Sequence, residues 1–361
     1  MLASAAIPFA IPSNKDALTK LYESAGGAKW RVKGHWPHGS PCRWHGIECE
    51  NGVVTSIDLG GNGATGTLPS ELCALTRLRV LNIDESRLSG TLPDCHTRLR
   101  TILLATNPNL SGTLPSLTRL TTLEELDLSR TRISGTISTA LGHLAELQRL
   151  QLDHTVITGT VPTQVGRLRS VESLFLHESP WLSGTLPTEL GQLAPSLRLG
   201  MSLASTRLSG TIPTHITHLA KLRALWLVHT RLSGTLPRSI GKMHLAELEV
   251  HASRLSGTLP SELGELRPSL RRCVLIAAQG PHQTFHSMRP ADRVQPDTNH
   301  FDCPLPAELP PACTQHLACT PALTSLGTTM RSHGGRGAER RDGRRGRGRG
   351  RARLLERRLA E

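Results

Sequence analysis

Aromatic residues and long apolar runs are what this chain most lacks. Only 3% of its 361 residues are aromatic, with one tyrosine, four phenylalanines and five tryptophans. No apolar run approaches the roughly 20 residues that a membrane-spanning helix needs, and no kinase segment is present. We therefore expect neither a transmembrane segment nor a complete transmembrane receptor.

Catalytic and metal-binding motifs are missing as well. The chain has no Gly-x-Ser-x-Gly, no His-Glu-x-x-His and no phosphate-loop spacing, and no Cys-x-x-Cys or paired-histidine motif. Ser239 and Lys242 have the Ser-x-x-Lys spacing, but the Ile-Gly between them belongs to a repeat described below. We interpret that pair as scaffold, and we expect no catalytic residues, no cofactor and no metal site. A hydrolase would need a nucleophile that the sequence does not reveal.

What the chain does contain is a repeat. The tetrapeptide Gly-Thr-Leu-Pro, or a close variant, recurs nine times at intervals of 22 to 26 residues. A self-similar period in this range indicates a solenoid, in which each unit stacks only on its neighbours. Leucine fills such a narrow coil better than bulky rings do, which accounts for the few aromatics. The anchoring glycines are Gly66, Gly90, Gly112, Gly135, Gly159, Gly184, Gly210, Gly234 and Gly257.

The fourth unit shows the expected local structure most clearly. Leu126 and Leu128 alternate with a polar residue, which is the period-2 pattern of a short strand with one buried face. Leu141, Leu144 and Leu147 follow at a spacing of three, which predicts a helical or 3₁₀ return segment. Because the chain returns to the same edge once per unit, successive strands should be parallel. The pattern predicts an α/β solenoid.

A small polar residue stands between the last strand leucine and the Ser-Gly pair of each unit. Such a side chain, if it points inward, can satisfy backbone groups of the turn and of the adjacent unit. We therefore expect this column to be structural. Its members are Asn62, Ser86, Asn107, Thr131, Thr155, Ser179, Thr206, Thr230 and Ser253.

From about Val53 to Leu275 the units follow Leu-x-x-Leu-x-Leu-x-x-Thr-x-Leu-Ser-Gly-Thr-Leu-Pro-x-x-Leu-Gly-x-Leu. In this pattern the chain resembles the plant-type leucine-rich repeat family. The segment ahead of it resembles that family's N-terminal cysteine cap, and the segment from Asn299 to Pro306 resembles the start of a C-terminal cap. The resemblance implies a right-handed superhelix with a parallel sheet on the concave face and short helical or 3₁₀ segments on the convex face. A second small sheet is expected at the Leu-Ser-Gly stretch.

The resemblance also implies a function and a domain layout. Its relatives are receptor ectodomains, receptor-like proteins and secreted inhibitors that bind peptides, glycans or other proteins. One unit lacks the usual proline, at Ser138, and we expect one softened turn there. The layout is a weak signal or disordered segment at 1–12, an N-terminal cap at 13–52, about ten repeats at 53–280, a C-terminal loop and cap at 281–326, and a disordered Arg/Gly-rich tail at 327–361.

The eight cysteines favour an oxidising compartment. Cys42 and Cys49 fall where relatives of the family form a disulfide in the cap. We expect Cys303 to pair with Cys313 or with Cys319, and Cys73 with Cys95 would join consecutive units. The sequon at Asn109 could carry a glycan if the chain is secreted.

The two ends of the chain leave alternatives open. The first twelve residues are small and apolar but lack a basic start, so a signal segment and a truncated terminus fit equally. From Arg331 to Glu361 there are twelve arginines and four acidic residues, and part of this stretch resembles an arginine–glycine segment that coats RNA phosphates. It lacks interleaved aromatics, so we expect a disordered cationic tail with at most weak nucleic-acid contact.

The residues that point outward from the strands are the candidate ligand contacts. The early part of this face is acidic, and the later part carries aromatics and histidines that we expect to be exposed. Phe175 and Trp226 are the strongest single candidates, and partly covered surface aromatics are the equally weighted alternative. A pH-sensitive or metal-binding stripe is the alternative for the histidines; we interpret them as solvated surface, because nothing in the sequence fixes their tautomers or brings three ligands to one point. The candidate contacts are Asp127, Arg130, Asp153, His154, Phe175, His177, Glu178, Trp226, His229, Glu249 and His251.

We interpret the chain as a non-enzymatic recognition scaffold that binds a protein, peptide or glycan on its concave face. A rigid array is pre-organised, so little entropy is lost on docking. This role places it outside the cell or at the cell surface. The alternative is an intracellular RNA-associated protein that acts through its basic tail.

Overall fold

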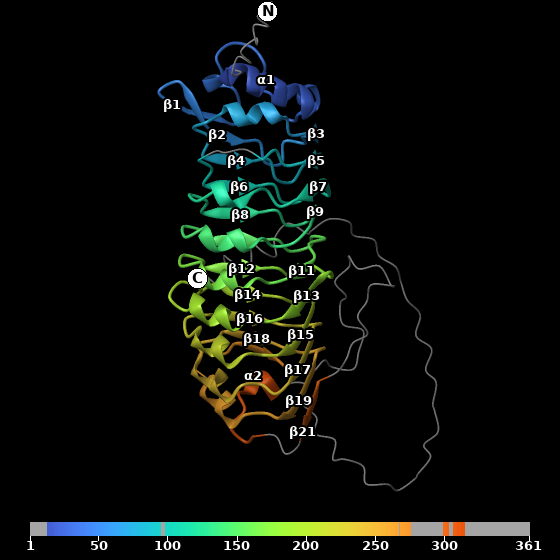
Figure 1. The fold of residues 1–361 in the computed structure, drawn as a ribbon, viewed down its shortest axis with the longest axis vertical. Helices are drawn as coiled ribbons and strands as arrows, with labels where there is room; N and C mark the ends of the chain where they lie inside the picture. Colours follow the sequence, from blue (N-terminus) through green and yellow to red (C-terminus); the bar gives the residue numbers. More distant parts are fainter. Residues whose placement is uncertain (1–12, 95–97, 267, 276–298, 303–305, 315–361) are drawn as a thin grey trace, which may run out of the picture.

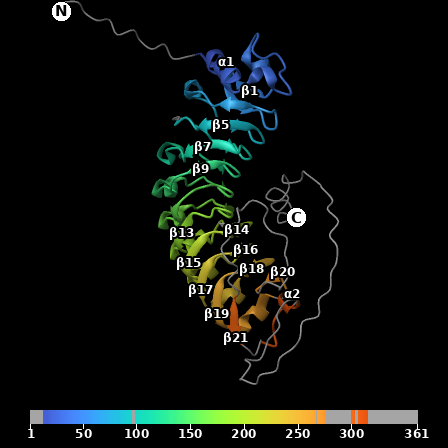
Figure 2. The ribbon, with the colours of Figure 1, turned by 90° about the vertical axis from the view of Figure 1, so that its right-hand side faces the viewer.

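The structure is a computed structural model that describes residues 13–94, 98–266, 268–275, 299–302 and 306–314. These residues form an elongated stack of rungs that curves along its length (Figures 1 and 2). Each rung contains a strand and a bend, and most described rungs add a second short strand and a 3₁₀ turn that leads to the next rung. The predicted α/β solenoid is confirmed.

An eleven-stranded sheet runs the length of the stack and forms its concave face. β1 pairs with β2 antiparallel, whereas the later neighbours are parallel and in register, so that Leu126, Leu150 and Leu174 lie side by side. The strands are β1 (Ile47–Glu50), β2 (Val53–Asp58), β4 (Val80–Asn82), β6 (Thr101–Leu103), β8 (Glu125–Asp127), β10 (Arg149–Gln151), β12 (Ser173–Phe175), β14 (Gly200–Ser202), β16 (Ala224–Trp226), β18 (Glu247–Glu249) and β20 (Arg272–Val274).

The Leu-Ser-Gly stretches form a second layer of parallel strands, as the resemblance implied. This layer is divided into a four-stranded and a six-stranded sheet. The division falls near the unit without proline, where Val156 N–H still donates to the Ile133 carbonyl at 3.0 Å. Ser138 Oγ accepts a hydrogen bond from Ala140 N–H there and so caps the following turn. The strands are β3 (Thr65–Thr67), β5 (Arg87–Thr91), β7 (Asn109–Thr113) and β9 (Arg132–Ser134), and then β11 (Gly159–Thr160), β13 (Leu182–Thr185), β15 (Arg207–Thr211), β17 (Arg231–Gly234), β19 (Arg254–Thr258) and β21 (His300–Asp302).

Short 3₁₀ helices bring the chain back to the concave sheet. They stack closely, because a Cβ atom at Gly142 would lie 2.8 Å from the Gln164 carbonyl oxygen of the next turn. Glycine is therefore the residue that this contact requires. The helices of the array are η3 (Ser70–Ala74), η4 (Leu117–Arg119), η5 (Thr139–His143), η6 (Thr163–Arg167), η7 (Thr188–Leu193), η8 (Thr214–His218), η9 (Arg238–Lys242) and η10 (Ser261–Leu266).

The predicted polar column is buried and structural. Asn107 shows why: its side chain accepts from Leu88 N–H at 2.8 Å and donates to the Ile83 carbonyl at 2.9 Å, on the preceding rung. Where a threonine replaces the asparagine, as at Thr206, its hydroxyl donates to the carbonyl three residues earlier. Asn299 repeats the asparagine arrangement behind the last rung and accepts from Leu255 N–H at 3.0 Å.

Four aromatic rings gather in the N-terminal cap. Helix α1 (Asn14–Ser24) begins with a capping box, followed by η1 (Gly27–Lys29) and η2 (Pro41–Arg43). Beside them Tyr22, Trp30, Trp36 and Trp44 form a chain of ring contacts with centroids 4.5 to 6.0 Å apart. The cap thus covers the first rung with a small aromatic core of its own.

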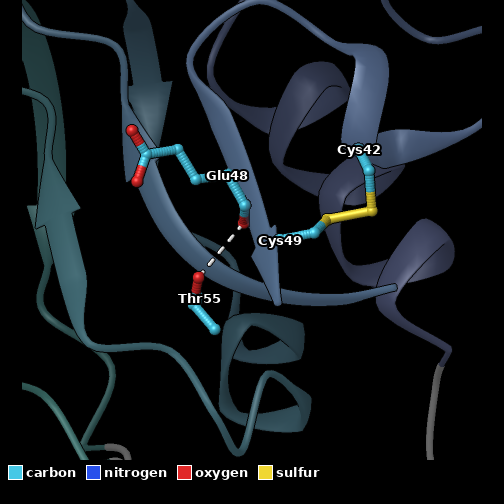
Figure 3. Close-up of a disulfide and its surroundings, with 4 residues drawn as sticks. All are labelled: Cys42, Glu48, Cys49 and Thr55. Atoms are coloured by element: carbon cyan, nitrogen blue, oxygen red, sulfur yellow. Dashed lines mark hydrogen bonds between the residues drawn. A yellow bond between two sulfur atoms is a disulfide. The ribbon is translucent and has the colours of Figure 1, made fainter. Parts of the chain in front are cut away.

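The predicted disulfide between Cys42 and Cys49 is present (Figure 3). It joins η2 to β1. In the same view Thr55 Oγ1 donates to the Glu48 carbonyl at 3.4 Å and so ties β2 to β1. This end of the stack is held by covalent and by hydrogen bonds.

The C-terminal end is closed differently from the prediction. Cys313, in helix α2 (Pro311–Thr314), is bonded to Cys273 of β20, so the predicted pairing of Cys313 with Cys303 is wrong. The alternative partner of Cys303, Cys319, lies outside the described residues. Cys273 faces inward on the last concave strand and is 5% exposed, and α2 packs over it, which brings the two Cα atoms within 4.6 Å. Cys73 is also disulfide-bonded, and its predicted partner Cys95 lies outside the described residues.

Other expectations fall on residues that the structure does not describe. These are the terminal segment at 1–12, the boundary near 280, the side chain of Cys303, and the Arg/Gly-rich tail. The domain boundaries therefore stay predictions. Within the described part of the chain, none of the helices has both the length and the apolar character that crossing a membrane requires.

Candidate functional site

Four outward positions per rung build the concave surface. Two lie on the strand, and two lie on the bend that follows it; for β10 these are Arg149, Gln151, Asp153 and His154. Because the strands are in register, residues at one position form a column across the sheet. Neighbours within a column are about 4.8 Å apart. Residues about 24 positions apart in sequence are thus direct neighbours on this surface.

The fourth outward position of each rung, which is the second on the bend, has a left-handed backbone. His154 has φ 54° and Glu178 has φ 53°, and His154 N–H donates to the His177 carbonyl of the next rung at 2.9 Å. A residue with a side chain pays about 1–2 kcal/mol for this conformation, and the hydrogen bonds between rungs hold it there. The column consists of Gly61, Glu85, Thr106, Arg130, His154, Glu178, Ser205, His229 and Ala252.

Asp153, His154 and His177 come together on β10, β12 and their bends. His154 Nδ1 donates to Asp153 Oδ2 at 3.0 Å, and His177 Nε2 lies 3.6 Å from the same oxygen. The two imidazole rings meet edge to face with centroids 5.4 Å apart. One ligand atom from each of the three residues lies within 4.8 Å of the other two. We call these three residues the Asp–His–His cluster.

The Asp–His–His cluster is largely covered. The side chain of Asp153 is 3% exposed, that of His154 15% and that of His177 22%. The expectation that these histidines are solvated surface residues is therefore wrong for this pair. The two rings cover one another edge to face, and the Phe175 ring lies against His177 with centroids 6.1 Å apart.

The charges in the cluster are set by burial and by its neighbours. Burial acts to raise the pKa of the Asp153 carboxyl, but His177, the hydrogen bond from His154, and Arg130 together hold it below its usual value. Burial lowers the pKa of His177, and Asp153 opposes that shift. At neutral pH the cluster therefore combines an ionised carboxylate with a neutral His177 ring.

Two more acidic residues flank the Asp–His–His cluster. Burial raises the pKa of Asp127 to about 7, although Ser129 N–H donates to its carboxylate at 3.0 Å. Burial also raises the pKa of Glu178, against the influence of His154 and a hydrogen bond from Ser205. The predicted contacts Asp127, Arg130 and Glu178 thus surround the cluster.

Phe175 and Trp226 do not form the exposed aromatic surface that the sequence predicted. Phe175 is 2% and Trp226 8% exposed, and their ring centroids are 6.2 Å apart. The reason is Gly200 on the strand between them: a Cβ atom there would lie 3.1 Å from the tryptophan ring and 3.2 Å from the phenylalanine ring. Both rings lean over the vacant position. Replacing either with alanine would lower the stability by about 3–5 kcal/mol.

A second histidine pair lies further along the same face. His229 and His251 meet edge to face with centroids 5.9 Å apart. Glu249, on the strand before His251, forms an ion pair with Arg272 at 2.8 Å. Burial raises the pKa of Glu249, and it lowers that of His229. The predicted contacts His229, Glu249 and His251 thus lie near one another, on other rungs than the Asp–His–His cluster.

Sequence reasoning missed two features. The Asp–His–His cluster could have been found by writing the repeats under one another, because Asp153 and His177 occupy the same position of successive units. Trp181 gave no repeat signal, since it follows an irregular bend; it is 42% exposed, and the Arg207 guanidinium stacks over its ring at 4.3 Å.

Comparison with known proteins agrees with the architecture. A family model described as Leucine Rich Repeat matches residues 122–144. The chain is 36% identical over 128 residues to Receptor-like protein 50 of Arabidopsis thaliana. That segment covers 34% of this chain and 14% of the relative, so the chain spans only a small part of that protein's length.

Solved structures of plant receptor ectodomains have the same fold. One is the ectodomain of the receptor kinase GASSHO1/SCHENGEN3 of Arabidopsis thaliana with Casparian strip integrity factor 2; it has a TM-score of 0.60, 26% identity, and coverage of 72% of this chain and 33% of that one. Another is the Arabidopsis HAESA ectodomain with an extended IDA peptide hormone, with a TM-score of 0.57, 26% identity, and coverage of 70% and 48%. The resemblance drawn from the sequence is confirmed.

Proposed function

We propose that this plant-type leucine-rich repeat array is a receptor-like, non-enzymatic scaffold that binds a peptide on its concave sheet. The observation that carries the proposal is the surface around Arg130: an exposed cation beside an ionised, covered carboxylate, Asp153, on a sheet fixed by repeating hydrogen bonds. Charged groups that are already positioned lose little entropy when a ligand docks. Of the related ectodomains named above, that of HAESA was solved with an extended IDA peptide hormone, and that of GASSHO1/SCHENGEN3 with Casparian strip integrity factor 2.

A peptide suits this surface better than a globular protein does. The outward columns are narrow and run across consecutive strands, so an extended chain can pass from rung to rung and place one side chain per one or two rungs. Polar groups on the surface fix the register of such a ligand, and binding specificity follows from their arrangement. A protein and a glycan are the alternative ligand classes for the same surface.

We further propose that the protein acts outside the cell or at the cell surface. Two disulfides, Cys42–Cys49 and Cys273–Cys313, close the two ends of the array, and such bonds persist in oxidising compartments. Asn109 is exposed at the start of β7, where a glycan would be accommodated. The intracellular RNA-binding alternative depends on a tail that lies outside the described residues, and no observation favours it.

The test is a displayed library of random peptides, selected against the full chain with its disulfides intact. Selected peptides are then measured by fluorescence anisotropy against Arg130→Glu, and against Arg231→Glu as the matched control on the second sheet. We expect at least a tenfold loss of affinity, about 1.4 kcal/mol, for the first variant and no change for the second. Equal binding to both variants would refute the assignment of the concave face.

A further inference from the structure

The Asp–His–His cluster has the composition of a metal site. Two imidazoles and one carboxylate are ligands that Zn²⁺ and other first-row dications accept. Ca²⁺ and Mg²⁺ require more numerous, mainly oxygen, ligands. Among the described residues, this is the group of histidine, cysteine and acidic side chains whose ligand atoms converge.

The distances within the cluster fit a tetrahedral cation. Bonds of about 2.0–2.2 Å to nitrogen and oxygen place two ligands of a tetrahedral Zn²⁺ about 3.4 Å apart. His177 Nε2 and Asp153 Oδ2 are 3.6 Å apart, which is too long for a good hydrogen bond but close to that spacing. His154 Nδ1 lies 3.0 Å from the same oxygen, and one ligand atom from each of the three residues lies within 4.8 Å of the other two.

Buried atoms without partners supply an independent observation. Asp153 Oδ1 and His177 Nδ1 are buried, and neither makes a hydrogen bond within the described residues. An unsatisfied buried carboxylate oxygen costs about 1–3 kcal/mol or more. The unpartnered Asp153 Oδ1 therefore lowers the stability of the fold unless a bound group compensates for it. A dication bound to Asp153 Oδ2 would offset that cost through its attraction for the whole carboxylate, although Oδ1 itself is not the coordinating atom.

The surrounding charges allow a dication to enter. Besides the two histidines, the cation that acts on Asp153 is Arg130, whereas Glu178 and Asp127 on the adjoining rungs are carboxyls. With a dication bound, these carboxyls would gain an opposite charge and ionise more readily. The cation is thus balanced by three acidic side chains against one guanidinium.

From this geometry we propose that Asp153, His154 and His177 bind a first-row transition-metal dication, with Zn²⁺ as the reference ion. Asp153 supplies one carboxylate oxygen, and each histidine supplies one ring nitrogen. Three protein ligands leave a fourth position for water on the concave side. The site joins β10 and β12 through their bends and would fix the left-handed His154 in place.

The test is isothermal titration calorimetry with ZnCl₂ on the full chain, without a polyhistidine tag and after removal of metal by a chelator. We expect one tight Zn²⁺ per chain and no comparable binding of CaCl₂. Asp153→Asn and His177→Ala each change a ligand and should weaken the Zn²⁺ affinity by about 100-fold or more, since loss of a group that only orients a ligand already costs about 10–100-fold. His229→Ala, from the second histidine pair, is the matched control and should leave it unchanged.

A spectroscopic measurement keeps the test independent of folding. Co²⁺ bound to two imidazoles and a carboxylate in a tetrahedral site absorbs visible light, and Asp153→Asn should abolish that band while its thermal unfolding stays cooperative. Unaltered Zn²⁺ affinity in Asp153→Asn, or an equal loss in His229→Ala, would overturn the proposal. Either result would mean that dispersed histidines bind the metal.

Discussion

The concave sheet carries two histidine pairs in the same register but in different surroundings. In each pair the first histidine is left-handed and donates its backbone N–H to the second, at 2.9 Å for His154 and His177 and at 3.3 Å for His229 and His251. The rings of both pairs meet edge to face. The backbone therefore provides the same geometry twice.

The difference lies in three matched positions. Around the first pair they hold Asp127, Asp153 and Glu178, and around the second they hold Ser202, Val228 and Ala252. The first pair thus faces buried carboxyls whose pKa values are displaced, whereas small or apolar residues occupy these positions at the second. The scaffold sets where side chains meet, and the residues at these positions decide the chemistry.

The largest effect is expected at Asp127. Its pKa is raised from 3.8 to about 7 in the folded protein, so the stability gained from the protonated form is complete below pH 3.8 and is lost as the pH rises through 7. At 1.36 kcal/mol per pH unit the loss is about 4 kcal/mol. Asp127→Asn stays neutral and keeps an acceptor for Ser129 N–H, so its free energy of unfolding should not show this loss as the pH rises.

Urea unfolding between pH 4 and pH 8, with a chelator present, measures this difference. Ser202→Ala is the matched control at the second pair and should leave the pH dependence of the wild type unchanged. If the wild type and Asp127→Asn lose stability in parallel over this range, the carboxyl of Asp127 is not the buried acid that we describe.

Exchanging the residues at the third outward position, Asp153 and Val228, tests the comparison directly. Asp153→Val gives the first pair the surroundings of the second, and Zn²⁺ affinity should fall about 100-fold. Adding Val228→Asp to that variant places a carboxylate between His229 and His251 and should restore part of the affinity. Calorimetry of the two variants measures the exchange; a double variant that binds no better than Asp153→Val would show that the pairs differ in more than the acid.

A smaller effect is expected at Ala252, which is left-handed with φ 52°. Glycine removes a conformational cost of about 1–2 kcal/mol and adds about 0.5–1 kcal/mol of chain entropy cost. Ala252→Gly should therefore raise the free energy of unfolding by about 0.5 kcal/mol in urea titrations. His154→Gly relieves the same strain but removes a proposed ligand, so it should lose Zn²⁺ binding; a clear loss of stability in Ala252→Gly would contradict the strain argument.

The parts of the fold that depend on nearest neighbours in the repeat were predictable. The period fixes which leucines face inward and places Asn107 and Thr206 in a buried column, because each bonds to its own rung or to the one before it. The surface was harder to predict. Phe175 and Trp226 are covered because Gly200, between them, lacks a side chain, and no single unit contains that information.

The candidate site was missed for a related reason. Asp153 and His177 are 24 residues apart and become neighbours only when the units are aligned and the left-handed bend is known. The disulfide partner of Cys313 was missed because Cys273 belongs to the last rung and α2 folds back over it, a contact outside the period of the repeat.

Anomalous scattering from a crystal of the full chain grown with ZnCl₂ tests the central claim most directly. We predict a strong peak bonded to Asp153, His154 and His177, and no comparable peak between His229 and His251. A peak at the second pair, or none at the first, would contradict the account.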